Sequence, residues 1–300
     1  MRTMRGRLSA ALAALSLLLV FGCDAPPVTQ GGKMRATPLK AVVSLSPSTT
    51  ELVGSFNYSG VLKGRTAADD FPVIAKSIPI VASVKPDYEK IAQIKPDLVV
   101  YDADLYNEQD VEKIKGMGFK TFVIDAKTVE TFVEQLYLLG AETESETSAN
   151  TYADKVLAAR NSALGDAIEP KPKVAVVLAG DGAEHYIAGT QGFLADIVKS
   201  AGGEPVGPAS DKFVALSPEA FIANNPDMIV VAFPRVENKD DESRANALKR
   251  VNIILNDKRF ANVSAVQNKR IVPIDEDVLT RRGYRVDKLI DELHKRVVSK

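Results

Sequence analysis

The strongest constraint on the fold is a pattern that occurs twice, 130 residues apart. Residues 87–100 read DYEKIAQIKPDLVV and residues 217–230 read SPEAFIANNPDMIV, so a glutamate, a proline and an aspartate recur at matching places. Each segment begins with helical apolar spacing and ends, after Pro-Asp, in an apolar run of strand length. Helix, Pro-Asp and strand often follow one another in α/β chains, but the equal spacing favours two α/β lobes of similar plan. A later pair, FVID at 122–125 and VPID at 272–275, supports the same interpretation.

The first half of the chain alternates short strands with helices. Residues 97–101 (DLVVY) and 120–124 (KTFVI) are continuous apolar or β-branched runs. Helical patterns at 88–94 and 108–116 separate them. Alternation of this kind predicts a parallel sheet that is covered on both faces.

A further strand and helix are predicted at the start of the folded region, near Lys40. A short β-branched run ends at Leu45. The segment Ser48-Thr49-Thr50-Glu51 follows, with a hydroxyl and a glutamate three residues apart. This is the spacing of a capping box, so we expect a helix to begin there.

A single long amphipathic helix is predicted between the two alternating regions. Apolar residues recur with i, i+3, i+4 spacing from Ser145 to Ile168, and Pro170 and Pro172 end the pattern. Such a helix is roughly 36 Å long, about the width of a small domain, and resists wide hinge motion. We therefore predict an N-terminal lobe over 40–144, a backbone helix over 145–169 and a C-terminal lobe over 170–300.

The N-terminal residues have the features of a lipoprotein signal peptide. Residues 1–22 hold three arginines, no acid and an apolar run of 14 residues, shorter than the about 20 needed to span a bilayer. Cys23, the only cysteine, follows Val-Phe-Gly, which resembles a lipobox. An ordinary secretory peptide or a buried core helix is the alternative. Residues 23–39 are rich in Pro and Gly and predict a flexible tether, so we expect an extracytoplasmic protein anchored through acylated Cys23.

Composition argues against several classes of function. After removal of residues 1–22, 35 basic residues face 39 acidic ones, so nothing predicts attraction to nucleic acid. The two histidines, His185 and His294, are too few for a zinc site built on imidazoles. The glycines at 180–182 and 189–192 lack the spacing of a phosphate-binding loop. We therefore expect no catalytic residues, no metal site and no cofactor.

From residue 40 onward the chain resembles the helical-backbone class of substrate-binding lipoproteins that serve ABC importers of cobalamin, heme and iron-siderophores. Four segments carry the resemblance: VVSLSPSTTEL (42–52), DYEKIAQIKPDLVV (87–100), SPEAFIANNPDMIVV (217–231) and RRGYR (281–285). The first of them is most similar to cobalamin-binding members. The resemblance implies an α/β fold of two Rossmann-like lobes joined by a single long backbone helix, with a ligand cleft between the lobes. It also implies a monomer that is not an enzyme and whose partners are permease subunits, a small metallo-organic ligand and, through the lipid, the membrane.

The resemblance also implies which residues meet the permease. Glu89 and Glu219 match the family's two docking glutamates, one in each lobe. From the sequence alone, each lies at the start of a predicted helix. An acid there also complements the helix dipole, worth about 0.3–1 kcal/mol, which is the alternative explanation.

Four residues match ligand-contacting positions of the cobalamin-binding members. Asp277 and Arg281 match an acid and a base that line the cleft, and Tyr186 and Phe213 match aromatic positions. The alternatives are a surface ion pair for the first two and core packing for the aromatics. Arg285 is expected to hold the lobe together rather than to touch ligand.

The ligand is predicted less sharply than the class. The chain has no tryptophan, and Ala68, Val84 and Asp102 stand where cobalamin-binding members carry aromatic residues. Cobalamin or a related corrinoid is the first expectation. A ferric siderophore is the alternative, and either it or another corrinoid would suit Arg65, Arg281 and Asp102 about as well as cobalamin. Heme has only His185-Tyr186 in its favour. A lipid-anchored extracytoplasmic enzyme or a binder of a surface partner is the alternative from another class.

Overall fold

The computed structural model describes residues 38–57, 60–180 and 184–299. The chain divides into two compact units, Met1–Met34 and Arg35–Lys300, and all described elements belong to the second. The predicted signal peptide, Cys23 and most of the predicted tether lie outside the described residues. Within the described part, no helix combines the length and apolarity needed to cross a membrane.

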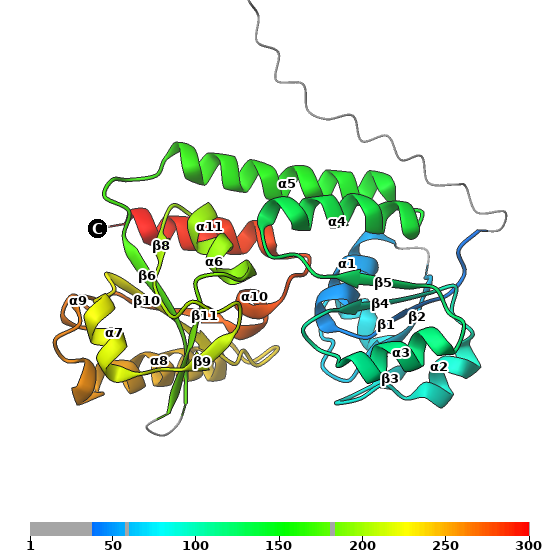
Figure 1. The fold of residues 1–300 in the computed structure, drawn as a ribbon, viewed down its shortest axis with the longest axis horizontal. Coiled ribbons are helices and arrows are strands. Elements are labelled where there is room, and N and C mark those ends of the chain that lie inside the picture. The colour runs from blue at the N-terminus through cyan, green and yellow to red at the C-terminus, as the bar shows by residue number, and fades with distance from the viewer. Residues whose placement is uncertain (1–37, 58–59, 181–183, 300) are drawn as a thin grey trace, which may run out of the picture. The chain divides into compact units, whose positions relative to one another are not determined.

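The first lobe contains a five-stranded sheet in the order β3-β2-β1-β4-β5 (Figure 1). Every neighbouring pair is parallel, as the alternating pattern predicts. Helices α2 and α3 have the predicted bounds, and strands β4 and β5 each begin one residue later than predicted. The elements are β1 (Val42–Ser44), α1 (Pro47–Phe56), β2 (Leu62–Thr66), the 3₁₀ helix η1 (Val73–Ser77), β3 (Ile80–Ala82), α2 (Tyr88–Ile94), β4 (Leu98–Asp102), α3 (Glu108–Gly116) and β5 (Thr121–Ile124).

The second lobe has a mixed sheet in the order β11-β10-β6-β7-β9, with β8 paired to β6. Strand β7 runs antiparallel to both β6 and β9, so the plan of the first lobe is not repeated in full. The chain between β6 and β7 is too short for a crossover helix, and a short connection between neighbouring strands makes them antiparallel. The elements are β6 (Lys173–Ala179), β7 (His185–Ala188), α6 (Phe193–Ser200), β8 (Glu204–Pro205), β9 (Phe213–Ala215), α7 (Pro218–Asn224), β10 (Met228–Phe233), α8 (Asp240–Leu255), η2 (Lys258–Phe260), α9 (Ser264–Gln267), β11 (Ile271–Asp275), α10 (Glu276–Thr280) and α11 (Val286–Val298).

The sequence repeat corresponds to a repeated structural unit. Helices α2 and α7 each end in a left-handed residue, Lys95 with φ 52° and Asn225 with φ 43°. The aspartates that follow, Asp97 and Asp227, each accept a 2.8 Å hydrogen bond from a backbone N–H at or just before the start of the neighbouring strand. Strands β4 and β10 then lie in the interior of their sheets. The two segments therefore turn a surface helix into a central strand in the same way.

Two helices, α4 (Val129–Glu142) and α5 (Glu146–Gly165), join the lobes. The predicted long helix is confirmed as α5, which spans about 30 Å at 1.5 Å per residue and ends before Pro170. It is not alone, because α4 and α11 pack along it (Figure 1). Gly140 of α4 makes this approach possible, since a Cβ there would lie 2.5 Å from the Cβ of Ala149. The residue boundaries of the lobes remain a prediction.

One buried cluster, here called the shared core, runs through both lobes. Each sheet places alternate residues in it, as the two-residue period of a strand requires. Val42 and Val100 of the first sheet and Val176 and Val230 of the second belong to the shared core, together with residues of α4, α5 and α11. The residues between them face separate clusters, one in each lobe. Both sheets are therefore covered on both faces, and the lobes are joined by packing as well as by covalent connection.

The start of α1 differs from the prediction. Ser46 caps the helix, its Oγ accepting from the Thr49 N–H at 3.2 Å, and Pro47 takes the first helical position. Ser48 instead donates to the Asp102 carboxylate at 3.1 Å. Glu51 is fully buried and faces two arginines of the second lobe. The predicted capping box was wrong, because the side chains of Ser48 and Glu51 bind buried partners elsewhere in the protein instead of the backbone at the start of the helix.

Candidate functional site

The RRGYR segment (281–285) links α10 to α11 and contacts the first lobe. Tyr152 of α5 positions it: the buried phenol donates to the Gly283 carbonyl at 2.8 Å and accepts from the Val286 N–H at 3.0 Å. Its ring stacks on Tyr284, with centroids 4.2 Å apart. Burial raises the pKa of the Tyr152 phenol well above its usual value, so the hydroxyl remains a donor. The long helix thus fixes the backbone from which the arginines project.

Glu51 is the main anchor for this segment in the first lobe. One carboxylate oxygen accepts from Arg281 Nη1 at 3.2 Å and Arg285 Nη2 at 2.6 Å. The other accepts from the Tyr284 N–H at 3.1 Å and Arg285 Nε at 3.2 Å. Gly283 is required beside it, since a Cβ there would lie 2.4 Å from the carboxylate. The expectation that Arg285 has a structural part agrees with these contacts.

Arg281 connects carboxylates of both lobes. It contacts Asp70 at 2.6 Å and Asp277 at 2.5 Å, in addition to Glu51. Burial raises the pKa of Asp277 to about 6. The attraction of Arg281 acts to lower this pKa, and the negative charge of Asp70 acts to raise it. Burial also acts to raise the pKa of Asp70, but hydrogen bonding and attraction to Arg281 outweigh it and lower that pKa. The two acids therefore share one guanidinium, and Asp277 takes up a proton first.

Arg282 forms a second buried connection between the lobes. Its guanidinium pairs with Asp102, with Nε 3.1 Å from Oδ2, and with Asp104 at 2.7 Å. It also donates to the Ala126 carbonyl at 3.0 Å. Asp102 is thus occupied by a structural ion pair. Likewise, the buried Arg65 donates to backbone carbonyls of its own lobe, so the contacts of both residues speak against a siderophore, whose fit here remains a prediction.

A cleft with a volume of about 530 Å³ opens beside this cluster. The first lobe lines it with the loop between β2 and η1, and the second with the loop before α8, the start of α10 and Arg285. An exposed ion pair, Lys76 with Glu237, joins the two sides. The lining residues are Asp70, Phe71, Val73, Arg235, Glu237, Asn238, Asp240, Asp275, Asp277 and Arg285.

The four predicted ligand contacts do not come together in this cleft. Asp277 lines it, and Arg281 lies beside it with its donors engaged by carboxylates. Tyr186 on β7 is 44% exposed and lines a separate hollow of about 180 Å³. Phe213 on β9 is half-buried and packs against the shared core. Their part in ligand binding remains a prediction.

The two predicted docking glutamates occupy equivalent places. Glu89 and Glu219 are each the second residue of a short helix, and both are exposed. The helices are capped by Asp87 and Ser217, whose side chains accept from backbone N–H groups of the first turn. Ser217 also donates to the Glu219 carboxylate at 3.1 Å.

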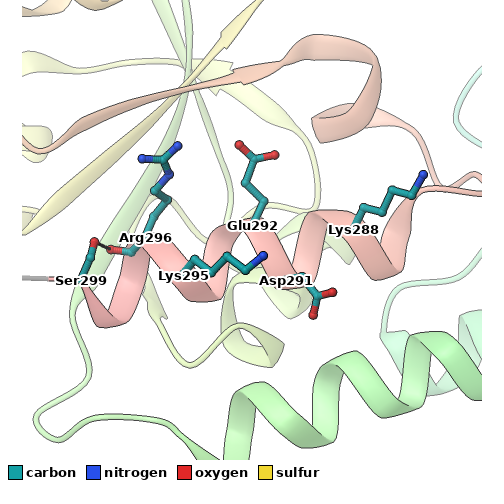
Figure 2. A pocket seen from close by; sticks show the side chains of 6 residues that line it. All are labelled: Lys288, Asp291, Glu292, Lys295, Arg296 and Ser299. Atoms are coloured by element: carbon teal, nitrogen blue, oxygen red, sulfur yellow. Dashed lines mark hydrogen bonds between the residues drawn. The ribbon is translucent and has the colours of Figure 1, made fainter.

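A further hollow, of about 420 Å³, lies along the exposed side of α11 (Figure 2). Its six lining residues all belong to that helix or to Ser299 just after it, and their charges are mixed. A hollow lined by one helix does not enclose a ligand. Across residues 38–57, 60–180 and 184–299, no group of three or more His, Cys, Asp or Glu is placed to hold a metal ion.

Comparison with known proteins identifies the family. The family model of the periplasmic binding proteins matches residues 42–278. The chain belongs to this family. Among its relatives is an uncharacterized ABC transporter substrate-binding lipoprotein of Bacillus subtilis, YvrC, 23% identical over 264 residues and covering 85% of this chain and 78% of that one. The vitamin B12-binding protein of Salmonella typhimurium is 29% identical over 226 residues, covering 74% of this chain and 84% of its own.

Solved structures of the family share the fold. A periplasmic heme-binding protein, BhuT, in complex with two hemes has a TM-score of 0.73 at 20% identity, covering 86% of this chain and 97% of that one. The periplasmic vitamin B12 binding protein BtuF of Vibrio cholerae has a TM-score of 0.69 at 18% identity, covering 87% and 97%. These likenesses confirm the predicted α/β architecture of two lobes.

Proposed function

We propose that this protein is the extracytoplasmic, lipid-anchored substrate-binding component of an ABC importer and that its ligand is cobalamin or a related corrinoid. The observation that carries the proposal is the cleft of about 530 Å³, lined by loops of both lobes in a chain of the periplasmic binding protein family. Relatives named as vitamin B12-binding proteins cover about three quarters of the chain and support the choice of ligand. A carrier of this kind binds and releases its ligand unchanged, so no enzymatic activity is proposed.

The chemistry of the cleft argues against heme. Proteins hold heme iron through His, Cys, Met or Tyr side chains. Among the residues that the structure describes, none of the side chains lining the cleft is of these types. His185 is 4% exposed, and its Nε2 lies 3.3 Å from Asp257, which leaves it unsuited to a ligand in the cleft.

The visible spectrum of the loaded protein tests the ligand. The purified full-length protein is incubated with cyanocobalamin, hemin and ferrioxamine B, passed through a desalting column and scanned. Each compound has a distinct absorption, and we expect the corrinoid spectrum to remain with the protein. Retention of ferrioxamine B alone makes the siderophore alternative correct, and retention of none refutes a carrier for metallo-organic ligands.

We further propose that Glu89 and Glu219 dock on the permease. Both carboxylates are exposed at equivalent helix starts, one in each lobe, where a basic socket can reach them. Glu89→Arg and Glu219→Arg should each reduce ligand uptake by cells and leave the affinity of the purified protein unchanged. Glu112→Arg is the matched control, because Glu112 is an exposed helical glutamate outside these positions. Normal uptake in the double variant contradicts docking through these residues.

The lipid anchor is proposed from the sequence around Cys23. Cys23→Ser should prevent acylation and release the protein from membranes, while far-UV circular dichroism and ligand binding stay as in the wild type. The reason is that residues 24–38 are rich in Pro and Gly, whereas Leu39 is the first residue of the shared core among those that the structure describes. A serine variant that still sediments with membranes through a detergent-sensitive attachment rules out this anchor.

A further inference from the structure

The two walls of the cleft differ in polarity. The wall from the first lobe is largely apolar: Phe71 and Val73 line it, Ile74 follows in the chain, and the one carboxylate, Asp70, is held by Arg281 at 2.6 Å. Val73 is 68% exposed and Ile74 66%, although both are large apolar side chains. Contiguous exposed apolar residues beside a cleft mark a surface that gains from being covered. The first lobe therefore offers a face suited to an apolar surface of the ligand.

The wall from the second lobe is acidic. Glu237 and Asp240 stand on the loop before α8 and at its first residue, and both are exposed. Asp275 and Asp277 add two carboxylates from the start of α10. Arg235 and Arg285 are the basic residues that line this wall, and Arg285 is held by Glu51. A ligand that approaches this wall meets an excess of acceptors.

The basic groups around the cleft are largely committed to protein carboxylates. Arg285 is held by the buried Glu51, and Arg281 by Glu51, Asp70 and Asp277. Lys76 pairs with Glu237. Together with these partners, the cleft and the arginines beside it hold six carboxylates and four basic groups. The carboxylates are Glu51, Asp70, Glu237, Asp240, Asp275 and Asp277, and the basic groups are Lys76, Arg235, Arg281 and Arg285. Two of these carboxylates and one basic group belong to the first lobe, and four carboxylates and three basic groups to the second, so each lobe has one carboxylate in excess.

We propose that the cleft selects an uncharged or cationic ligand that carries N–H donors on one edge and an apolar surface on the other, and that it excludes polyanionic chelates. The inference rests on the proposed function and narrows it. The primary amides on the rim of a corrin are donors that carboxylates accept, whereas the propionates of heme or the charges of an anionic ferric chelate meet carboxylates. Like charges brought together in an interface are costly and enforce such discrimination.

The test compares corrinoids that differ only in charge. Cyanocobalamin is titrated into the full-length protein by isothermal calorimetry, and so is a derivative in which three side-chain amides have been hydrolysed to carboxylates. We expect the tricarboxylate to bind at least about tenfold more weakly at low salt, with a smaller difference at high ionic strength because salt screens exposed charges. Equal or tighter binding of the tricarboxylate overturns the inference.

Variants assign the selectivity to the second-lobe wall. The double variant Glu237→Gln/Asp240→Asn should reduce the ratio of the two affinities by about two- to fivefold per residue, the range of one exposed charge interaction. Both residues are exposed, so folding should be preserved. Glu112→Gln, on α3, is the matched control and should leave the ratio unchanged. A ratio that stays the same in the double variant places the selectivity elsewhere and overturns the assignment.

The same titrations separate failure of the inference from failure of the proposed function. Hemin or ferric citrate binding more tightly than cyanocobalamin refutes the charge selectivity but still leaves a carrier for metallo-organic ligands. If cyanocobalamin, ferrioxamine B, hemin and ferric citrate all fail to bind, the proposed function itself is wrong, and the inference falls with it.

Discussion

Replacement of Glu51 by glutamine should strongly destabilise the protein. Each oxygen of the buried carboxylate accepts two hydrogen bonds: Oε1 from Arg281 and Arg285, and Oε2 from Arg285 and the Tyr284 N–H. Glutamine has nearly the same shape but only one accepting oxygen. Whichever way the amide turns, its NH₂ group faces at least one guanidinium donor, and two hydrogen bonds are lost.

The size of the effect follows from the burial of the pair. Removing one partner of a buried ion pair costs about 3–5 kcal/mol, because the other charge is left without compensation. Arg281 retains Asp70 and Asp277, so the cost should lie near the lower limit, about 3 kcal/mol. Since proteins are stable by only about 5–15 kcal/mol, the loss should be readily measured.

Urea denaturation followed by far-UV circular dichroism measures the change, because the chain has no tryptophan for fluorescence. Glu112→Gln is the control: its side chain is 64% exposed in an i,i+3 pair with Lys115, so it should cost less than about 0.5 kcal/mol. If the free energy of unfolding falls with urea concentration at a similar slope in the variants and the wild type, their midpoints of unfolding can be compared directly. A Glu51→Gln protein within about 1 kcal/mol of the wild type would refute the argument that this carboxylate anchors the RRGYR segment.

Three further substitutions test the packing and the charge cluster. Tyr152→Phe should cost about 2–4 kcal/mol in urea denaturation, because a backbone carbonyl and a backbone N–H each lose a buried partner. Gly140→Ala should cost about 1–3 kcal/mol in the same assay by forcing α4 from α5, whereas Gly116→Ala, with open space around it, should cost nothing. Asp277 has a pKa of about 6 in the folded protein against about 3.9 unfolded, so its contribution to stability is full below about pH 4 and lost as pH rises through 6. When the pH is lowered from 7 to 4, the free energy of unfolding of the wild type should therefore rise by about 1 kcal/mol relative to that of Asp277→Asn, a value reduced because Asp277 is partly exposed. Parallel pH profiles of the two proteins would contradict this.

Elements with strong local periodicity could be predicted from the sequence. Helices α2 and α3 begin and end at the predicted residues, and the long helix α5 lies within its predicted range. The repeat at an offset of 130 was informative because it reflects backbone requirements: a left-handed cap at Lys95 and Asn225, then an aspartate that binds backbone N–H groups. Such requirements are local, so residue types record them directly.

Contacts between distant residues could not be predicted in the same way. Glu51 has the spacing of a capping residue, and only the fold brings it to Arg281, 230 positions away. Nothing local in the sequence marks Arg282 as the partner of Asp102, although two adjacent arginines followed by glycine signal an unusual segment. Val84 was expected at a cleft position, yet it is 88% exposed and does not line the cleft. Pairing of buried charges depends on tertiary geometry, which periodicity does not encode.

The distribution of contacts limits how the cleft can respond to a ligand. Beside the long helix, the lobes are tied by the shared core and by the buried groups around Glu51 and Arg282. On the cleft side, the lobes are joined by the exposed pair of Lys76 with Glu237, worth about 0–1 kcal/mol, and by Arg281 with Asp70. Separation there breaks these ion pairs but leaves the shared core intact, whereas separation beside the helix would expose buried charge and apolar surface. Opening on the cleft side therefore costs less than opening on the helix side, and a ligand that covered Val73 would add apolar burial there.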